Sequence, residues 1–208
     1  MAKRKRRSQK RHTVRNWIIG ILAVIVIFLG VYAGHHFYRI WNQQRIEQER
    51  IENERRAKEL FIQQVAPEAQ AMQNTYHVYA SITIAQAILE SQWGRSQLAS
   101  EYHNLFGIKG TGSNSKLMTT KEHVDGHWVV IKGRFRVYDS WSDSIKDHTR
   151  LMLNGTDTNH QNYERVVNAK NYEEAARALQ DCGYATDPDY ADKLINVIKT
   201  YKLYNYDK

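Results

Sequence analysis

Glu90 is a carboxylic acid at the end of an apolar run, "AQAILE", in a chain of 208 residues. No lysine or arginine lies three or four residues away on either side, so no local charge favours its ionised form. On a helical wheel, Glu90 falls between Gln86 and Gly94, with Ala87 and Trp93 nearby. Partial burial against Trp93 would raise the pKa of this carboxyl group, as general acids require. The alternative is a glutamate at the edge of an exposed helix face.

A glycosidase needs a second acid across a cleft from the first. Glu122 is a candidate, and the spacing leaves Asp125 and Asp139 open as well. If Asp125-Gly126 forms a two-residue hairpin turn, Glu122 pairs opposite Val129 on an otherwise apolar strand face. An acid on that face is understandable if the face borders a cleft.

Other chemistry has little support in the sequence. Cys182 is the only cysteine, so it excludes an intrachain disulfide, and no histidine motif accompanies it as a nucleophile would require. The nine histidines are scattered, and we expect neither a metal nor another cofactor. An exported domain without disulfides suits the outer face of a bacterial membrane.

The N-terminal region predicts a membrane anchor. Residues 1–16 hold eight lysines and arginines and no acid, whereas the remaining residues are balanced in charge, which argues against nucleic-acid binding. Residues 17–34 contain no charged residue and would span about 27 Å as a helix, close to the thickness of a bilayer core. The basic tail favours a cytoplasmic N-terminus. A cleaved signal peptide is the main alternative, but no clear cleavage site follows.

The rest of the chain predicts a charged helical spacer over residues 35–58 and a globular domain over residues 59–208. We expect a helix in residues 60–78, with Pro67 near its start or at a kink, and a second helix over residues 81–99. Ser81 or Thr83 would cap the second helix.

The pattern of residues 117–138 predicts strands, with turns at Asp125-Gly126 and Lys132-Gly133. Amphipathic helices follow to the C-terminus, and the predicted fold is therefore mainly α with a small β-lobe.

Four motifs in order resemble glycoside hydrolase family 73, the endo-β-N-acetylglucosaminidases of bacterial autolysins. They are "TIAQAILESQWGRSQLA", "NLFGIKG", "TTKEHVDGHWVVIKGRFRVYDSWSDSIKDH" and "LQDCGYATDPDYADKLINVIKTY", and the resemblance runs from about Leu60 to Leu203. It implies a lysozyme-like fold and hydrolysis of the GlcNAc-β-1,4-MurNAc bond of peptidoglycan.

The resemblance also implies site residues. The catalytic set would be Glu90 as general acid, Glu122 as second acid and Tyr184 near the reacting sugar. Substrate-binding positions would be Trp93, Asn104, Phe106, Lys109, Tyr138 and Tyr190. Phe106 could equally be a core residue. Gln92 stands where the family commonly has glycine, and a helical wheel puts it well away from Glu90.

The sequence leaves the mechanism open. Glu122 could activate water or stabilise an oxocarbenium ion, or the substrate's acetamido group could attack with Tyr184 holding it. A muramidase or lytic transglycosylase on the same fold, and an inactive peptidoglycan-binding scaffold, are the alternatives to a glucosaminidase. The expected partners are glycan strands and, through residues 17–34, the bilayer, with the protein as a monomer.

Overall fold

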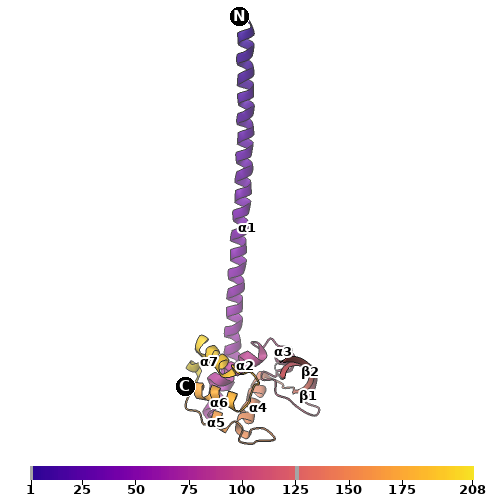
Figure 1. Cartoon of the computed structure of the whole chain (residues 1–208). Helices are drawn as coiled ribbons and strands as arrows, with labels where there is room; N and C mark the ends of the chain where they lie inside the picture. The colour runs from indigo at the N-terminus through magenta and orange to yellow at the C-terminus, as the bar shows by residue number, and fades with distance from the viewer. Residues whose placement is uncertain (1, 125–126) are drawn as a thin grey trace. The chain divides into compact units, whose positions relative to one another are not determined.

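The computed structural model describes the backbone of residues 2–124 and 127–208 (Figure 1). Within these ranges it describes the side chains of residues 16–119, 129–130 and 132–208. The chain divides into two compact units, Met1–Arg56 and Ala57–Lys208, which are described separately below.

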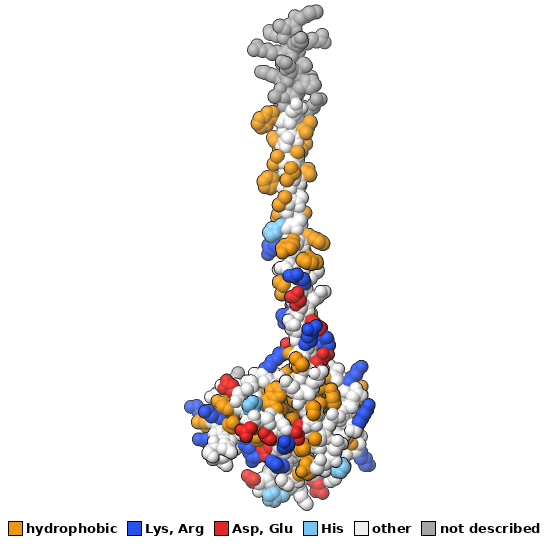
Figure 2. Space-filling model, turned by 180° about the vertical axis from the view of Figure 1, so that it is seen from behind, with side chains coloured by type: hydrophobic (Ala, Val, Ile, Leu, Met, Phe, Trp, Pro, Cys, Tyr) orange, Lys and Arg blue, Asp and Glu red, His pale blue; other side chains and the backbone are white. Residues whose placement is uncertain are grey.

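The first unit consists of the greater part of helix α1, which runs from Ala2 to Tyr76. Its apolar stretch has a mean hydropathy of 2.5 over 18 residues, and none of that stretch is buried, so the helix is long and apolar enough to cross a membrane. Apolar side chains surround this part of the helix, and charged ones follow (Figure 2). In the charged part, Arg50 pairs with Glu47 and Arg55 pairs with Glu52, contacts that support an exposed helix.

The last turns of α1 belong to the second unit. Phe61, Val65 and Ala69 lie on one helix face and are buried in its core. Pro67 lies inside α1, so the prediction of a helix start at this residue is wrong. A proline removes one backbone hydrogen bond, and we attribute the continuity of α1 across it to the buried contacts on either side.

Helix α2, Ala80–Ser91, is almost entirely buried. It begins after Tyr79, so the predicted caps at Ser81 and Thr83 are wrong, and both residues lie within the helix. Side chains from elsewhere in the unit satisfy its first N–H groups instead. Gln73 accepts from the Ala80 N–H at 2.6 Å, and Asp207 accepts from the Ser81 N–H at 2.7 Å.

The single helix predicted over residues 81–99 is two helices. Gln92, Trp93 and Gly94 all have left-handed backbone conformations, with φ of 54°, 64° and 74°, and this turn ends α2. Helix α3, Gln97–Tyr102, then begins with Ser96 as its cap, whose side chain accepts from the Ala99 N–H. The helical-wheel position assigned to Gln92 is therefore also wrong, because Gln92 lies beyond the helix.

The β-lobe is a two-stranded antiparallel ribbon of β1, Ser115–Val124, and β2, His127–Arg136 (Figure 1). Glu122 pairs with Val129, which confirms the predicted register. The Asp125-Gly126 turn itself lies outside the described residues. The second predicted turn, at Lys132-Gly133, is wrong, because both residues keep their cross-strand partners and β2 continues through them.

Five further helices complete the second unit. They are α4 (Trp141–Asn154), α5 (Glu164–Val167), α6 (Tyr172–Asp181), α7 (Tyr190–Thr200) and the 3-10 helix η1 (Leu203–Tyr206). Ser140 and Asn171 cap α4 and α6. One core joins α1, α2, α4, α6 and α7. The predicted class, mainly α with a small β-lobe, is confirmed.

Candidate active site

Glu90 lies in the last turn of α2 and keeps solvent access. The Tyr190 hydroxyl donates a hydrogen bond to its Oε1 at 2.8 Å. Burial nevertheless raises the pKa of the Glu90 carboxyl, and the hydrogen bond from Tyr190 lowers it by less. The solvent access and the raised pKa together indicate a carboxyl group that is open to solvent on one side and surrounded by protein atoms on its other sides. Such a group can retain a proton and donate it to a bound molecule.

Tyr190, the first residue of α7, connects this acid to the core. Its side chain is only 4% exposed. The buried Gln86 Nε2 donates to the Tyr190 hydroxyl at 3.3 Å, and that hydroxyl donates to Glu90. Gln86 and Glu90 are one helical turn apart on α2, so a single tyrosine contacts both. The structure therefore places Tyr190 beside the acid.

A row of aromatic rings continues from Tyr190. Tyr184 stacks on Tyr190 with ring centroids 5.8 Å apart, and it meets His148 edge-on at 6.1 Å and Tyr163 at 6.0 Å. His148 in turn stacks on Phe106 at 4.0 Å. Burial raises the pKa of Tyr184 well above its usual value, so its hydroxyl is neutral. The structure thus brings Glu90, Tyr190, Tyr184 and Phe106 into one continuous group.

His148 is a member of this row that the sequence reasoning missed. It is fully buried, and burial lowers its pKa to about 3, so the imidazole is neutral. Neither ring nitrogen has a hydrogen-bond partner among the described residues. The sequence does contain an indication that His148 is buried, because His148 lies on the apolar face of α4 with Ile145 and Met152 at helical spacing.

Trp93 belongs to a different aromatic group. Its ring meets Phe61 at 6.0 Å and Tyr201 at 4.8 Å, and the Lys58 ammonium lies 5.2 Å from its centroid. The helical wheel places Trp93 near Glu90 only if the helix continues to residue 93. Because α2 ends at Ser91, that expected position does not apply to Trp93. The structure does not bring Trp93 into the group around Glu90.

Asn104 is buried and binds backbone groups. Its Nδ2 donates to the carbonyl oxygens of Ile108 and Arg136, each at 2.9 Å, and its Oδ1 accepts from the Ile108 N–H at 3.1 Å. These bonds join the loop after α3 to the end of β2. Lys109 is exposed on that loop, where its backbone pairs with Phe135. In the structure, Asn104 therefore holds the base of the β-lobe.

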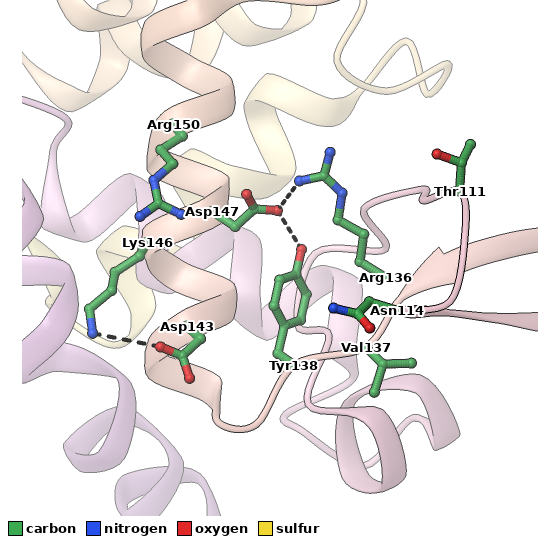
Figure 3. Close-up of a pocket in the computed structure, with 9 residues that line it drawn as sticks. All are labelled: Thr111, Asn114, Arg136, Val137, Tyr138, Asp143, Lys146, Asp147 and Arg150. Atoms are coloured by element: carbon green, nitrogen blue, oxygen red, sulfur yellow. Dashed lines mark hydrogen bonds and ion pairs between the residues drawn. The ribbon is translucent and has the colours of Figure 1, made fainter.

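Tyr138 lines a polar cavity of about 420 Å³ between α4, the end of β2 and the loop before β1 (Figure 3). Its hydroxyl donates to Asp147 Oδ2 at 2.6 Å, and Arg136 donates to the same oxygen at 2.5 Å. We call this the α4 cavity, and its lining residues are Thr111, Asn114, Arg136, Val137, Tyr138, Asp143, Lys146, Asp147 and Arg150.

The second acid stays a prediction. Glu122 lies near the end of β1, but its side chain lies outside the described part of the structure. Asp139 follows the ribbon and is exposed. In the described part of the chain, no three histidine, cysteine, aspartate or glutamate side chains gather as metal ligands would.

Comparisons with known proteins identify the family. The model of the family described as mannosyl-glycoprotein endo-beta-N-acetylglucosaminidase matches residues 66–203. Exo-glucosaminidase LytG of Bacillus subtilis is 46% identical over 152 residues, which are 73% of this chain and 54% of LytG. The probable N-acetylmuramidase of Lactococcus lactis subsp. cremoris is 39% identical over 155 residues, 73% of this chain and 35% of that protein.

A solved structure agrees. The catalytic domain of the autolysin Auto from Listeria monocytogenes matches with 37% identity and a TM-score of 0.67, covering 77% of this chain and 97% of that domain. The chain spans about half the length of LytG and about a third of the muramidase. It belongs to the glucosaminidase family, glycoside hydrolase family 73, and its second unit is a glycoside hydrolase domain with the family's lysozyme-like α+β fold.

Proposed function

We propose that this protein hydrolyses the GlcNAc-β-1,4-MurNAc bond of peptidoglycan as an endo-β-N-acetylglucosaminidase. The names of its relatives support this substrate. Peptidoglycan alternates GlcNAc with MurNAc, so its strands contain two kinds of glycosidic bond, and the names glucosaminidase and muramidase each denote cleavage of one of them. The name autolysin denotes an enzyme that acts on the cell wall built from this polymer.

Glu90 is the proposed general acid, and its environment is the observation that carries the proposal. It combines solvent access, a pKa raised by burial and a hydrogen bond from Tyr190. A group of this kind gives its proton to the glycosidic oxygen as the bond breaks. Tyr190 holds the carboxyl group in position and was expected from the sequence to bind substrate.

Glu122 and Tyr184 complete the proposed catalytic set. Glu122, as a carboxylate, activates water or stabilises the oxocarbenium ion. Tyr184 has a neutral hydroxyl close to the Glu90–Tyr190 pair, so it can hold the acetamido group of GlcNAc if that group attacks. Asn104, Phe106, Lys109, Tyr138 and Trp93 remain proposed substrate positions, and of these Phe106 lies in the aromatic row and Tyr138 lines the α4 cavity.

The test compares the wild type with Glu90→Gln on purified sacculi. We expect Glu90→Gln to lose at least about a hundredfold in rate, since general acid catalysis contributes this much or more. Glu101→Gln, which changes an exposed glutamate on α3, is the matched control and should keep full activity. Wall-lytic activity that survives in Glu90→Gln would remove the catalytic assignment and favour another acid.

Product analysis identifies the bond. GlcNAc at the new reducing ends supports the proposal, whereas MurNAc or 1,6-anhydro-MurNAc at those ends identifies a muramidase or a lytic transglycosylase. Large fragments at early times indicate internal cleavage, and a steady release of small sugars indicates the terminal cleavage named for LytG.

A cell-wall hydrolase domain implies a position outside the cytoplasm, facing the wall. We further propose that residues 17–34 anchor the protein with its N-terminus in the cytoplasm, supported by the length and hydropathy of α1. Replacing residues 1–40 by a cleavable signal peptide should then release activity to the medium, and activity that stays in the membrane fraction would contradict the anchor. We also propose a monomer, which light scattering in detergent would test.

A further inference from the structure

The α4 cavity is lined by more cations than acids. Arg136, Lys146 and Arg150 contribute three positive charges, and Asp143 and Asp147 contribute two negative charges. Asp143, Lys146, Asp147 and Arg150 follow one another at helical spacing along α4, and Arg136 meets Asp147 from the end of β2 (Figure 3).

Most of these charges already have a partner. The Asp147 carboxylate accepts a hydrogen bond from Arg136. The Lys146 Nζ lies 3.7 Å from Asp143 Oδ1 and 3.8 Å from Glu68 Oε2. Arg150 differs, since within the described part of the chain it has neither an ion pair nor a hydrogen bond. The cavity therefore keeps one uncompensated guanidinium.

Arg136 is oriented toward the cavity by Asp147. Only its Nη1 donates to that carboxylate, and a guanidinium has five N–H groups. Arg136 is paired with Asp147, and Arg150 has no acidic partner among the described residues. Both guanidinium groups still offer N–H donors in a planar fork, which suits the binding of a further carboxylate.

The cavity adjoins the proposed active site through α4. Asp147 lines the cavity, and the next residue, His148, contacts Tyr184 in the aromatic row. Tyr138, on the cavity wall, donates to Asp147 from the other side. The cavity and the aromatic row therefore share helix α4, at the consecutive residues Asp147 and His148.

We propose that the α4 cavity is a subsite in which Arg150 and Arg136 bind a carboxylate attached to a MurNAc residue of the substrate. The inference rests on the proposed function, because MurNAc carries a lactyl group and stem peptides, whereas GlcNAc carries no carboxylate. The carboxylate belongs either to the stem peptide or, where the peptide has been removed, to the lactyl group. The cavity makes the enzyme prefer substrates that carry this charge.

The experiment measures kcat/KM of the full chain, in detergent, on three preparations of soluble glycan strands. The first bears native stem peptides, the second bears stem peptides with every carboxylate converted to an amide, and the third is peptide-free. In Arg150→Gln we expect the ratio of kcat/KM on native strands to that on amidated strands to fall about twofold to fivefold, as for one exposed ion pair. Arg177→Gln removes an exposed arginine from α6 and should leave this ratio unchanged.

Peptide-free strands separate the two sources of the carboxylate. If Arg150→Gln also loses activity there, the lactyl carboxylate binds in the subsite, and if only peptide-bearing strands are affected, the stem peptide binds there. An equal ratio in the wild type and Arg150→Gln, or an equal fall in Arg177→Gln, would overturn the subsite.

Binding distinguishes this failure from failure of the proposed function. The Glu90→Gln protein and the Glu90→Gln/Arg150→Gln protein are titrated with the same strands by calorimetry. Weaker binding of native strands by the double variant supports the subsite even if the wild type cleaves nothing, and equal binding of native and amidated strands by both proteins contradicts it.

Discussion

Replacing Asn104 by alanine tests whether this side chain supports the fold or binds substrate. The resemblance places it among substrate-binding residues, whereas its side chain makes three hydrogen bonds to the backbone of Ile108 and Arg136. Asn104→Ala removes all three. At about 1 kcal/mol of net stabilisation each, the loss is about 3 kcal/mol. For a domain of this size, that corresponds to a fall of roughly 6–12 °C in Tm.

The assay is thermal unfolding of the full chain in detergent, followed by circular dichroism, with KM and kcat measured well below the transition. Asn104→Asp is a second variant. It keeps the Oδ1 acceptor for the Ile108 N–H, but its other carboxylate oxygen would face the carbonyl oxygens of Ile108 and Arg136 in a buried position. Its Tm should therefore be at least as low as that of Asn104→Ala. For Asn104→Ala, a Tm within 1–2 °C of the wild type combined with a raised KM would refute the structural role and leave substrate binding as the role of Asn104.

Three further predictions concern the acid, the turn after it and the buried histidine. Tyr190→Phe removes the hydrogen bond that lowers the pKa of the general acid, so the basic limb of the pH profile of kcat/KM should move to higher pH, and an unmoved limb would contradict the assigned contact. Gly94→Ala should destabilise the protein by more than the 1–2 kcal/mol typical of a left-handed residue, because the new Cβ would lie 2.7 Å from Trp141. Gly112→Ala has the same sign of φ and open space, so an equal loss of stability in denaturant unfolding would show that overlap is unimportant. His148 binds a proton in the unfolded chain below about pH 6.5 but in the folded protein only below about pH 3, so stability should fall by up to about 1.4 kcal/mol per pH unit as the pH drops through that window. His148→Phe should flatten this slope in urea titrations, and an equally steep slope would show that another group causes it.

The local sequence pattern predicts the structure correctly where residues close in the sequence determine it. The spacing around Asp125-Gly126 gave the correct partner for Glu122, since a two-residue turn leaves one possible register. The amphipathic helices after the ribbon were also predicted. The raised pKa of Glu90 was correct in direction, and the burial that causes it comes with Tyr190 as hydrogen-bond partner.

Local pattern failed where distant contacts or unusual backbone conformations decide. Tyr190 is 100 residues from Glu90, and no periodicity relates them. Gln92 and Trp93 adopt left-handed conformations without being glycine, so nothing in their residue types indicates the break after α2. A helical wheel continued past Ser91 therefore places Trp93 beside Glu90, whereas its ring packs against Phe61 and Tyr201.

That early end of α2 has an electrostatic consequence. Glu90 is the penultimate residue of the helix and so lies at the negative end of the helix macrodipole. A carboxylate is disfavoured at such an end, so the peptide backbone itself adds to burial in raising the pKa of Glu90. Because this contribution comes from main-chain dipoles, substitution of neighbouring side chains leaves it intact as long as the left-handed turn still stops the helix one residue after the acid.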